Sequence, residues 1–219
     1  MTLMQRMARL ALLVALPLTL AACGINTIPT QEERAKAQWA EVQNQYQRRA
    51  DLIPNLVATV KGYAAQESSV LIGVTQARAS ALQVRSDPGI TQDPAAFQRY
   101  AAAQNNLSLA LAPLRVLQEA YPDLKSNENF LALQAQLEGT ENRVAVARRD
   151  YNDAVRDYNT TLRTFPQIIW AKTVHGSSKP MELFQATATA QSAPTVDFGA
   201  PAAPATPPPG AAPGSPPPK

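Results

Sequence analysis

Residues 128–166 read ENFLALQAQLEGTENRVAVARRDYNDAVRDYNTTLRTFP, and they decide the fold because an apolar residue recurs at every seventh position. The series comprises Phe130, Leu137, Val144, Tyr151, Tyr158 and Phe165. This repeat places the side chains on one face of an α-helix, because two helical turns take about seven residues. We therefore predict one helix of roughly 38 residues, about 57 Å long. Ser126 or Asn127 would cap its start, and Pro166 would end it.

Two other segments carry the same period. In residues 39–82 the apolar residues again step by seven, and Pro54 predicts a kink or a junction between two collinear helices. In residues 97–121 a similar stripe is interrupted at Pro113, which predicts a second kink. No segment alternates with a period of two, so the sequence predicts an all-α domain, a long antiparallel bundle of three to four helices. An intermolecular coiled coil is the alternative architecture, because heptads also join separate chains.

A short apolar stretch near the N-terminus predicts an export signal. Arg6 and Arg9 precede residues 10–20, of which only Pro17 and Thr19 are not plainly aliphatic, and small residues follow. Eleven residues are too few to span a bilayer, which needs about 20. We therefore interpret residues 1–22 as a signal peptide.

The end of this stretch resembles a bacterial lipobox, formed by Leu20, Ala21, Ala22, Cys23 and Gly24. In lipoproteins with this motif the cysteine is acylated and becomes the new N-terminus. The resemblance thus implies a lipid anchor at Cys23, the only cysteine of the chain. The alternative is an ordinary signal peptide beside an idle cysteine. Gly24 and not an aspartate follows the cysteine. In a two-membrane bacterium, this resemblance to sorted lipoproteins implies the outer membrane, with the protein facing the periplasm or the cell exterior.

Composition divides the rest of the chain into three parts. Residues 23–30 are a short leash behind the anchor, and residues 31–185 form the helical domain, rich in Ala, Gln, Leu and Arg. Residues 186–219 contain ten of the nineteen prolines and are predicted to be disordered. The formal net charge of +3 falls to +1 without Arg6 and Arg9. This balance lacks the basic footprint of nucleic-acid binding, so we expect no nucleic-acid partner.

Several motifs of the helical domain together resemble the LemA family. They are RRADLIPNLV (48–57), VKGYA (60–64), YPDLK (121–125), NF (129–130), LEGTENR (137–143), ARRDYN (147–152), YN (158–159) and FP (165–166). The resemblance covers about residues 31–185. It implies a membrane-attached helical bundle facing away from the cytoplasm, with no settled biochemical activity. Many relatives use an N-terminal membrane helix where this chain has the lipobox.

The sequence offers little for catalysis. Helical bundles can hold two metal ions between carboxylates and Glu-x-x-His pairs. The carboxylates spaced for this are Glu138, Glu141, Asp150, Asp153 and Asp157. However, the single histidine, His175, lies beyond the last long helix, and the acids lie off the apolar seam beside arginines. We interpret them as a solvated face with intrahelical ion pairs, and we predict no catalytic residue, metal or cofactor.

Six residues are candidates for binding a partner, and each also has a structural interpretation. Arg48, Arg49 and Asp51 could form a cap or an interhelix pair near Pro54, or the rim of a partner site. Asn152 and Asn159 each follow a seam tyrosine and would fix register if buried, or line a recognition face if exposed.

Trp170 belongs to an apolar stretch, residues 165–184, that either folds back over the open end of the bundle or meets a membrane or partner. The sequence predicts a lipid-anchored cell-envelope bundle that acts as a non-catalytic adaptor or scaffold for an unidentified envelope or membrane protein. The alternative is a passive spacer between membrane and cell wall. The oligomeric state stays open.

Overall fold

The computed structural model describes residues 24–84 and 89–185, and every regular element among them is helical. These elements are α2 (Thr27–Tyr63), α3 (Ser68–Gln83), the 3₁₀ turn η1 (Ile90–Gln92), α4 (Pro94–Leu111), α5 (Pro113–Ala120), α6 (Pro122–Lys125), α7 (Glu128–Thr161) and α8 (Gln167–Thr173). The two longest, α2 and α7, have 37 and 34 residues. At 1.5 Å per residue each is about 50–55 Å long.

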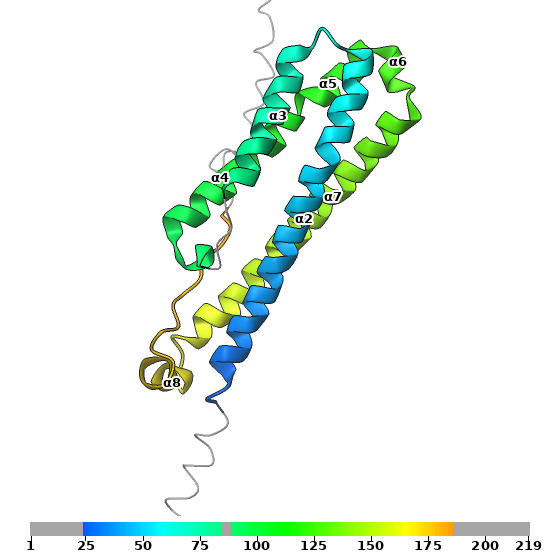
Figure 1. Ribbon diagram of the computed structural model, residues 1–219. Helices are drawn as coiled ribbons and strands as arrows, with labels where there is room; N and C mark the ends of the chain where they lie inside the picture. Colours follow the sequence, from blue (N-terminus) through cyan, green and yellow to red (C-terminus); the bar gives the residue numbers. More distant parts are fainter. Residues whose placement is uncertain (1–23, 85–88, 186–219) are drawn as a thin grey trace, which may run out of the picture. The chain divides into compact units, whose positions relative to one another are not determined.

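The long helices form an antiparallel bundle (Figure 1). The chain ascends in α2, descends in α3, ascends again through α4 and α5, and descends in α7. α2 packs along α7, while α3 packs along α4 and α2. This arrangement confirms the predicted all-α antiparallel bundle. The predicted interruption at Pro113 is also confirmed, because α4 ends at Leu111 and α5 begins with this proline.

Two apolar cores follow each other along the bundle. The first uses the N-terminal half of α2, η1, the start of α4, the end of α7 and residues Met181 and Phe184. The second uses the C-terminal half of α2, α3, the end of α4, α5, α6 and the start of α7. α3 has only 16 residues, and its buried side chains all belong to the second core. The segment around Met181 therefore closes the first core.

Helix boundaries differ from expectation at both ends of the domain. α2 begins at Thr27, so residues 27–30 are helical and not part of a leash. The reason is packing, since Ile28 is completely buried in the first core. α7 begins as predicted, with the Asn127 side chain accepting a hydrogen bond from the Phe130 N–H. It ends at Thr161, and Phe165, the last member of the heptad series, is 79% exposed.

Pro54 does not divide α2, which is one continuous helix through this residue. Proline lacks an N–H, so the carbonyl of Ala50, four residues earlier, loses its helical donor. Arg78 on α3 supplies a replacement, because its Nε donates to the Ala50 carbonyl oxygen at 2.7 Å. The residue Ala50 is only 2% exposed, so this carbonyl would otherwise be buried and unpaired. The sequence predicted a kink or a helix junction at Pro54. Instead, the carbonyl that Pro54 leaves free accepts a hydrogen bond that joins α2 to α3.

Replacing Arg78 with alanine is expected to lower the free energy of unfolding by about 1–3 kcal/mol, because the Ala50 carbonyl is left without a donor. In a Pro54→Ala background the same change should matter less, since the substituted residue regains an N–H for that carbonyl. Denaturant unfolding of the four proteins measures this coupling. Arg99→Ala on α4, whose side chain binds a carbonyl of its own helix, is the control. Equal Arg78→Ala effects in both backgrounds would contradict the interpretation.

Several sequence-based expectations lie outside the described residues. They are the signal peptide (1–22), the lipobox residues Leu20 to Cys23, and the proline-rich segment 186–219. Within residues 24–84 and 89–185, the helices contain no stretch that is long and apolar enough to cross a membrane.

Candidate functional site

A cleft lies between the α4–α5 junction and α7. Its volume is about 270 Å³. The apolar part of its lining comprises Leu56, Leu111, Ala112, Leu114, Phe130 and Leu137. α7 contributes one wall because residues 130, 134, 137, 138 and 141 fall on one helical face. The cleft is smaller than the about 300–1,000 Å³ of pockets for drug-sized ligands, and it matches one or two inserted side chains better.

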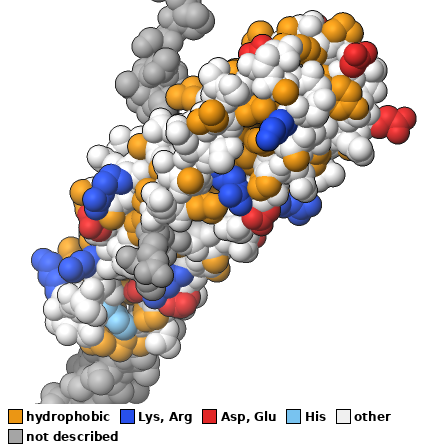
Figure 2. Space-filling model, turned by 45° about the horizontal axis from the view of Figure 1, so that its top comes forward, with side chains coloured by type: hydrophobic (Ala, Val, Ile, Leu, Met, Phe, Trp, Pro, Cys, Tyr) orange, Lys and Arg blue, Asp and Glu red, His pale blue; other side chains and the backbone are white. Residues whose placement is uncertain are grey.

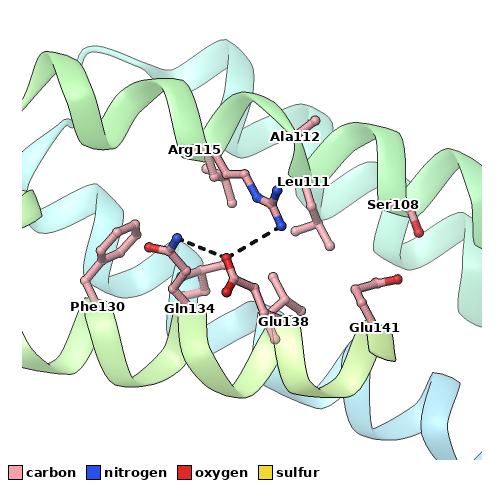
Figure 3. A pocket seen from close by; sticks show the side chains of 11 residues that line it. Ser108, Leu111, Ala112, Arg115, Phe130, Gln134, Glu138 and Glu141 are labelled. Atoms are coloured by element: carbon pink, nitrogen blue, oxygen red, sulfur yellow. Dashed lines mark hydrogen bonds and ion pairs between the residues drawn. The ribbon is translucent and has the colours of Figure 1, made fainter. Parts of the chain in front are cut away.

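Polar side chains cross this cleft (Figure 3). Arg115 reaches from α5 toward Glu138 on α7, with 3.6 Å between Nη2 and Oε1. Gln134 Nε2 donates to the same carboxylate at 3.3 Å, while its own Oε1 is buried without a hydrogen-bond partner among the described residues. The Arg115 side chain is 69% exposed, so the ion pair contributes less than about 1 kcal/mol. An entering segment can therefore displace this pair at little energetic cost.

A buried arginine lies behind one end of the cleft and between the two cores. Arg49 is 1% exposed, and its Nη1 donates to Glu141 Oε1 at 2.8 Å and to Ser108 Oγ at 2.7 Å. Its Nη2 donates to the side-chain and backbone oxygens of Gln104 at 2.7 and 3.1 Å. Glu141 and Ser108 also line the cleft. Arg49 thus makes an interhelix pair, one of the two alternatives stated for it, and it fixes the orientation of two cleft residues.

Two of the asparagines of α7, Asn152 and Asn159, bind the backbone of the segment that follows α8. Asn152 Nδ2 donates to the Phe184 carbonyl and its Oδ1 accepts from the Phe184 N–H, both at 2.9 Å. Asn159 holds Met181 in the same way, at 2.8 and 2.9 Å. We call residues 179–184 the strap. Both asparagines therefore have a structural role in the first half of the bundle.

The spacing of the asparagines matches the strap. Seven residues of α-helix span about 10.5 Å. Three residues of extended chain, from Met181 to Phe184, span about 10 Å. The distance between the two asparagines therefore matches the distance between Met181 and Phe184. The strap runs antiparallel to α7, because the later asparagine binds the earlier strap residue. The seam tyrosines add to the register, because Tyr158 donates to the Lys179 carbonyl at 3.1 Å and Tyr151 to that of Glu182 at 2.8 Å.

The strap carries Phe184 into an aromatic cluster with Trp39, Phe97, Tyr100 and Tyr151. The Phe184 ring centroid lies 4.8 Å from that of Phe97 and 5.6 Å from that of Tyr151. Burial raises the pKa of Tyr151 and of Tyr158, so both phenols stay protonated and keep donating to the strap. The stretch 165–184 thus folds back over the first core, one of the two outcomes considered for it.

The six sequence-based candidates do not converge on one site. Arg48 and Asp51 are exposed on α2, where Asp51 accepts a hydrogen bond from Gln47 of the same helix at 2.8 Å. Trp170 is half-buried on α8 and packs against the first core. Gly24, the one lipobox residue that is described, lies beside Trp170, because a Cβ added there would be 3.5 Å from the indole Nε1.

The cleft itself was missed by sequence reasoning. Glu138 and Glu141 were interpreted as parts of a solvated face with intrahelical pairs, and this is wrong in detail, because both pair with arginines of other helices. Leu111 belongs to the apolar stripe of residues 97–121, but Arg115 and Gln134 carried no signal in the sequence. Across the described part of the chain, no group of three or more His, Cys, Asp or Glu side chains is arranged to hold a metal ion.

Comparison with known proteins gives matches of two kinds. The model of the LemA family matches residues 38–198. Magnetosome protein MamQ 2 and magnetosome protein MamQ 1 of Paramagnetospirillum magneticum are each 28% identical over 157 residues. Magnetosome protein MamQ of Magnetospirillum gryphiswaldense is 25% identical over the same length. Each match covers 64% of this chain and 58% of the relative, so this chain spans little more than half the length of these curated relatives.

Proposed function

The chain belongs to the LemA family, and from this premise we propose that it is a non-catalytic adaptor, tethered to a membrane of the cell envelope, that binds an envelope or membrane protein. The observation that carries the proposal is the cleft between the α4–α5 junction and α7, which is apolar inside and charged at its mouth. The proposed occupant is an apolar segment of that protein. The tether is the acylated Cys23 implied by the lipobox, on the outer membrane where the cell has two.

Three features of the cleft favour a protein segment as its occupant. Its volume suits one or two side chains, as in the pockets that anchor peptide segments. Leu109 and Val116, which flank the lining residues of α4 and α5 along the chain, are 70% exposed and would extend the apolar contact. Arg115 and Glu138 offer both signs of charge at the mouth, which suits a polar rim around an apolar centre.

The charged groups at the cleft are arranged for structure and recognition. Glu141 is bound to the buried Arg49, and Glu138 pairs with Arg115. Because both carboxylates are paired with arginines, neither is placed to act as a general base or as one member of an acid–base pair. A binding role therefore agrees with the site better than a catalytic one.

The proposal predicts position-specific crosslinking in cells. A photoreactive amino acid at Ala112, an exposed lining residue, should capture one dominant protein, whereas the same group at the exposed Ala79 of α3 should not. Arg115→Glu should lower this crosslinking about tenfold, which corresponds to about 1.4 kcal/mol of binding free energy. Mass spectrometry identifies the captured protein, and immunoblotting measures its amount.

Two controls separate a lost partner contact from a damaged bundle. Arg99→Glu on α4 makes the same charge change at an exposed arginine that does not line the cleft. The double variant Arg115→Glu/Glu138→Arg restores an ion pair across the cleft with reversed charges. If the partner recognises these charges, crosslinking stays low in the double variant. Equal crosslinking from Ala112 and Ala79, or full tolerance of all three variants, would contradict the adaptor and leave a spacer.

A further inference from the structure

We propose that the end of the bundle around α8 is a lipid-binding surface that lies on the bilayer, as a second membrane contact beside the N-terminal anchor. This inference rests on the membrane tether of the proposed function, but it is independent of the partner cleft. It concerns three apolar side chains, which we call the α8 patch: Phe165, Ile169 and Val174.

The α8 patch is unusually exposed for side chains of this size. Phe165 is 79% exposed, Ile169 49% and Val174 54%. No residue of α8 itself is buried, although Trp170 packs against the first core from this helix. Apolar side chains gather beside the pale-blue histidine at this end of the molecule (Figure 2). α8 is thus held on the bundle through Trp170, while Ile169 in this helix, and Phe165 and Val174 just before and after it, are exposed.

The described chain begins at this same end. Gly24 lies against Trp170, where an added Cβ would be 3.5 Å from the indole nitrogen. One residue later, the Ile25 carbonyl is 2.9 Å from His175 Nε2, just beyond α8. Cys23 precedes Gly24 by a single peptide bond. Acyl chains on that cysteine would therefore enter a bilayer one residue before Gly24, which lies against α8, and this brings the α8 patch to the membrane surface.

The charged residues around the α8 patch favour anionic lipid as its binding partner. Residues 163–179 contain Arg163, Lys172 and Lys179 and no acidic residue. Glu32 and Glu33, in the second turn of α2, are both ion-paired with Lys36, at 2.9 and 2.8 Å. Exposed apolar side chains next to basic ones are the combination by which surface helices bind anionic lipid. An indole at the boundary is also typical of membrane interfaces.

The test places a polarity-sensitive fluorescent label on the patch of the full chain. Ile169→Cys provides the labelling thiol, and Val116→Cys, on the exposed side of α5, is the matched control. The labelled proteins are reconstituted into vesicles of phosphatidylethanolamine and phosphatidylglycerol that contain a lipid-borne quencher. We expect blue-shifted and quenched emission at position 169 and aqueous, unquenched emission at 116. The wild-type chain, acylated at Cys23, should take no label.

The outcomes separate this inference from the tether. Protein that floats with vesicles but has an aqueous label at 169 would overturn the α8 contact and leave the tether intact, and failure to float would overturn both. Phe165→Ser/Val174→Ser should keep flotation and abolish quenching at 169, because the anchor remains while the patch is lost. Photocrosslinking from position 169 to a protein, without quenching by lipid, would assign the patch to a protein partner and overturn the lipid proposal.

Discussion

Asn159→Ala is expected to lower the free energy of unfolding by about 2–4 kcal/mol, although it removes only one polar side chain from α7. The reason is that the asparagine satisfies both backbone groups of Met181, whose side chain is buried in the first core. Each buried group left without a partner costs about 1–3 kcal/mol. Asn152→Ala should act similarly through Phe184. Denaturant unfolding followed by far-UV circular dichroism measures the loss.

The double variant Asn152→Ala/Asn159→Ala distinguishes a strap that releases as a unit from two separate contacts. Both asparagines hold the same segment, so once one end has detached the other has less to hold. We expect a loss smaller than the sum of the single losses, together with faster proteolytic cleavage within residues 179–184. Asn142→Ala, at an exposed asparagine of the same helix, should change stability by less than about 0.5 kcal/mol. A strictly additive double variant, with the strap still protected, would contradict this view.

Glu141→Ala is expected to lower the free energy of unfolding by about 3 kcal/mol, because it leaves the Arg49 charge buried without its counter-ion. This loss is at the low end of the range for breaking a buried ion pair. The Glu141 side chain is 36% exposed, so water can enter and solvate part of the Arg49 charge in its place. Glu141→Gln should lose less, because the amide oxygen still accepts a hydrogen bond from Arg49. Denaturant unfolding of these variants at one pH measures both losses.

Glu138→Ala is the matched control for this prediction. It removes a carboxylate three residues earlier on the same helix, and its arginine partner, Arg115, is 69% exposed. The expected loss is below about 1 kcal/mol, because water solvates an exposed arginine that has lost its partner. If Glu138→Ala and Glu141→Ala were equally destabilising, burial of Arg49 would not explain the effect.

The long helices were predictable because heptad periodicity is a local property of the chain. Phe130, Val144 and Tyr151 mark a buried face whatever lies opposite, and Asn127 caps the helix through its own backbone neighbours. The continuity of α2 was not predictable in this way. Pro54 removes a hydrogen bond in any context, but Arg78 of α3 supplies the replacement donor, and nothing local to residue 54 indicates this.

The sequence by itself determined the helical class, the start of α7, the break at Pro113 and the family, because these depend on periods, caps and motifs within one segment. Only the tertiary structure decided what the polar residues do. Arg49 and Arg48 are neighbours of the same type, yet one is buried between the cores and the other is exposed. Likewise Asn142 is exposed while Asn152 holds the strap. A polar side chain takes its role from the groups opposite it, and those groups come from distant parts of the chain.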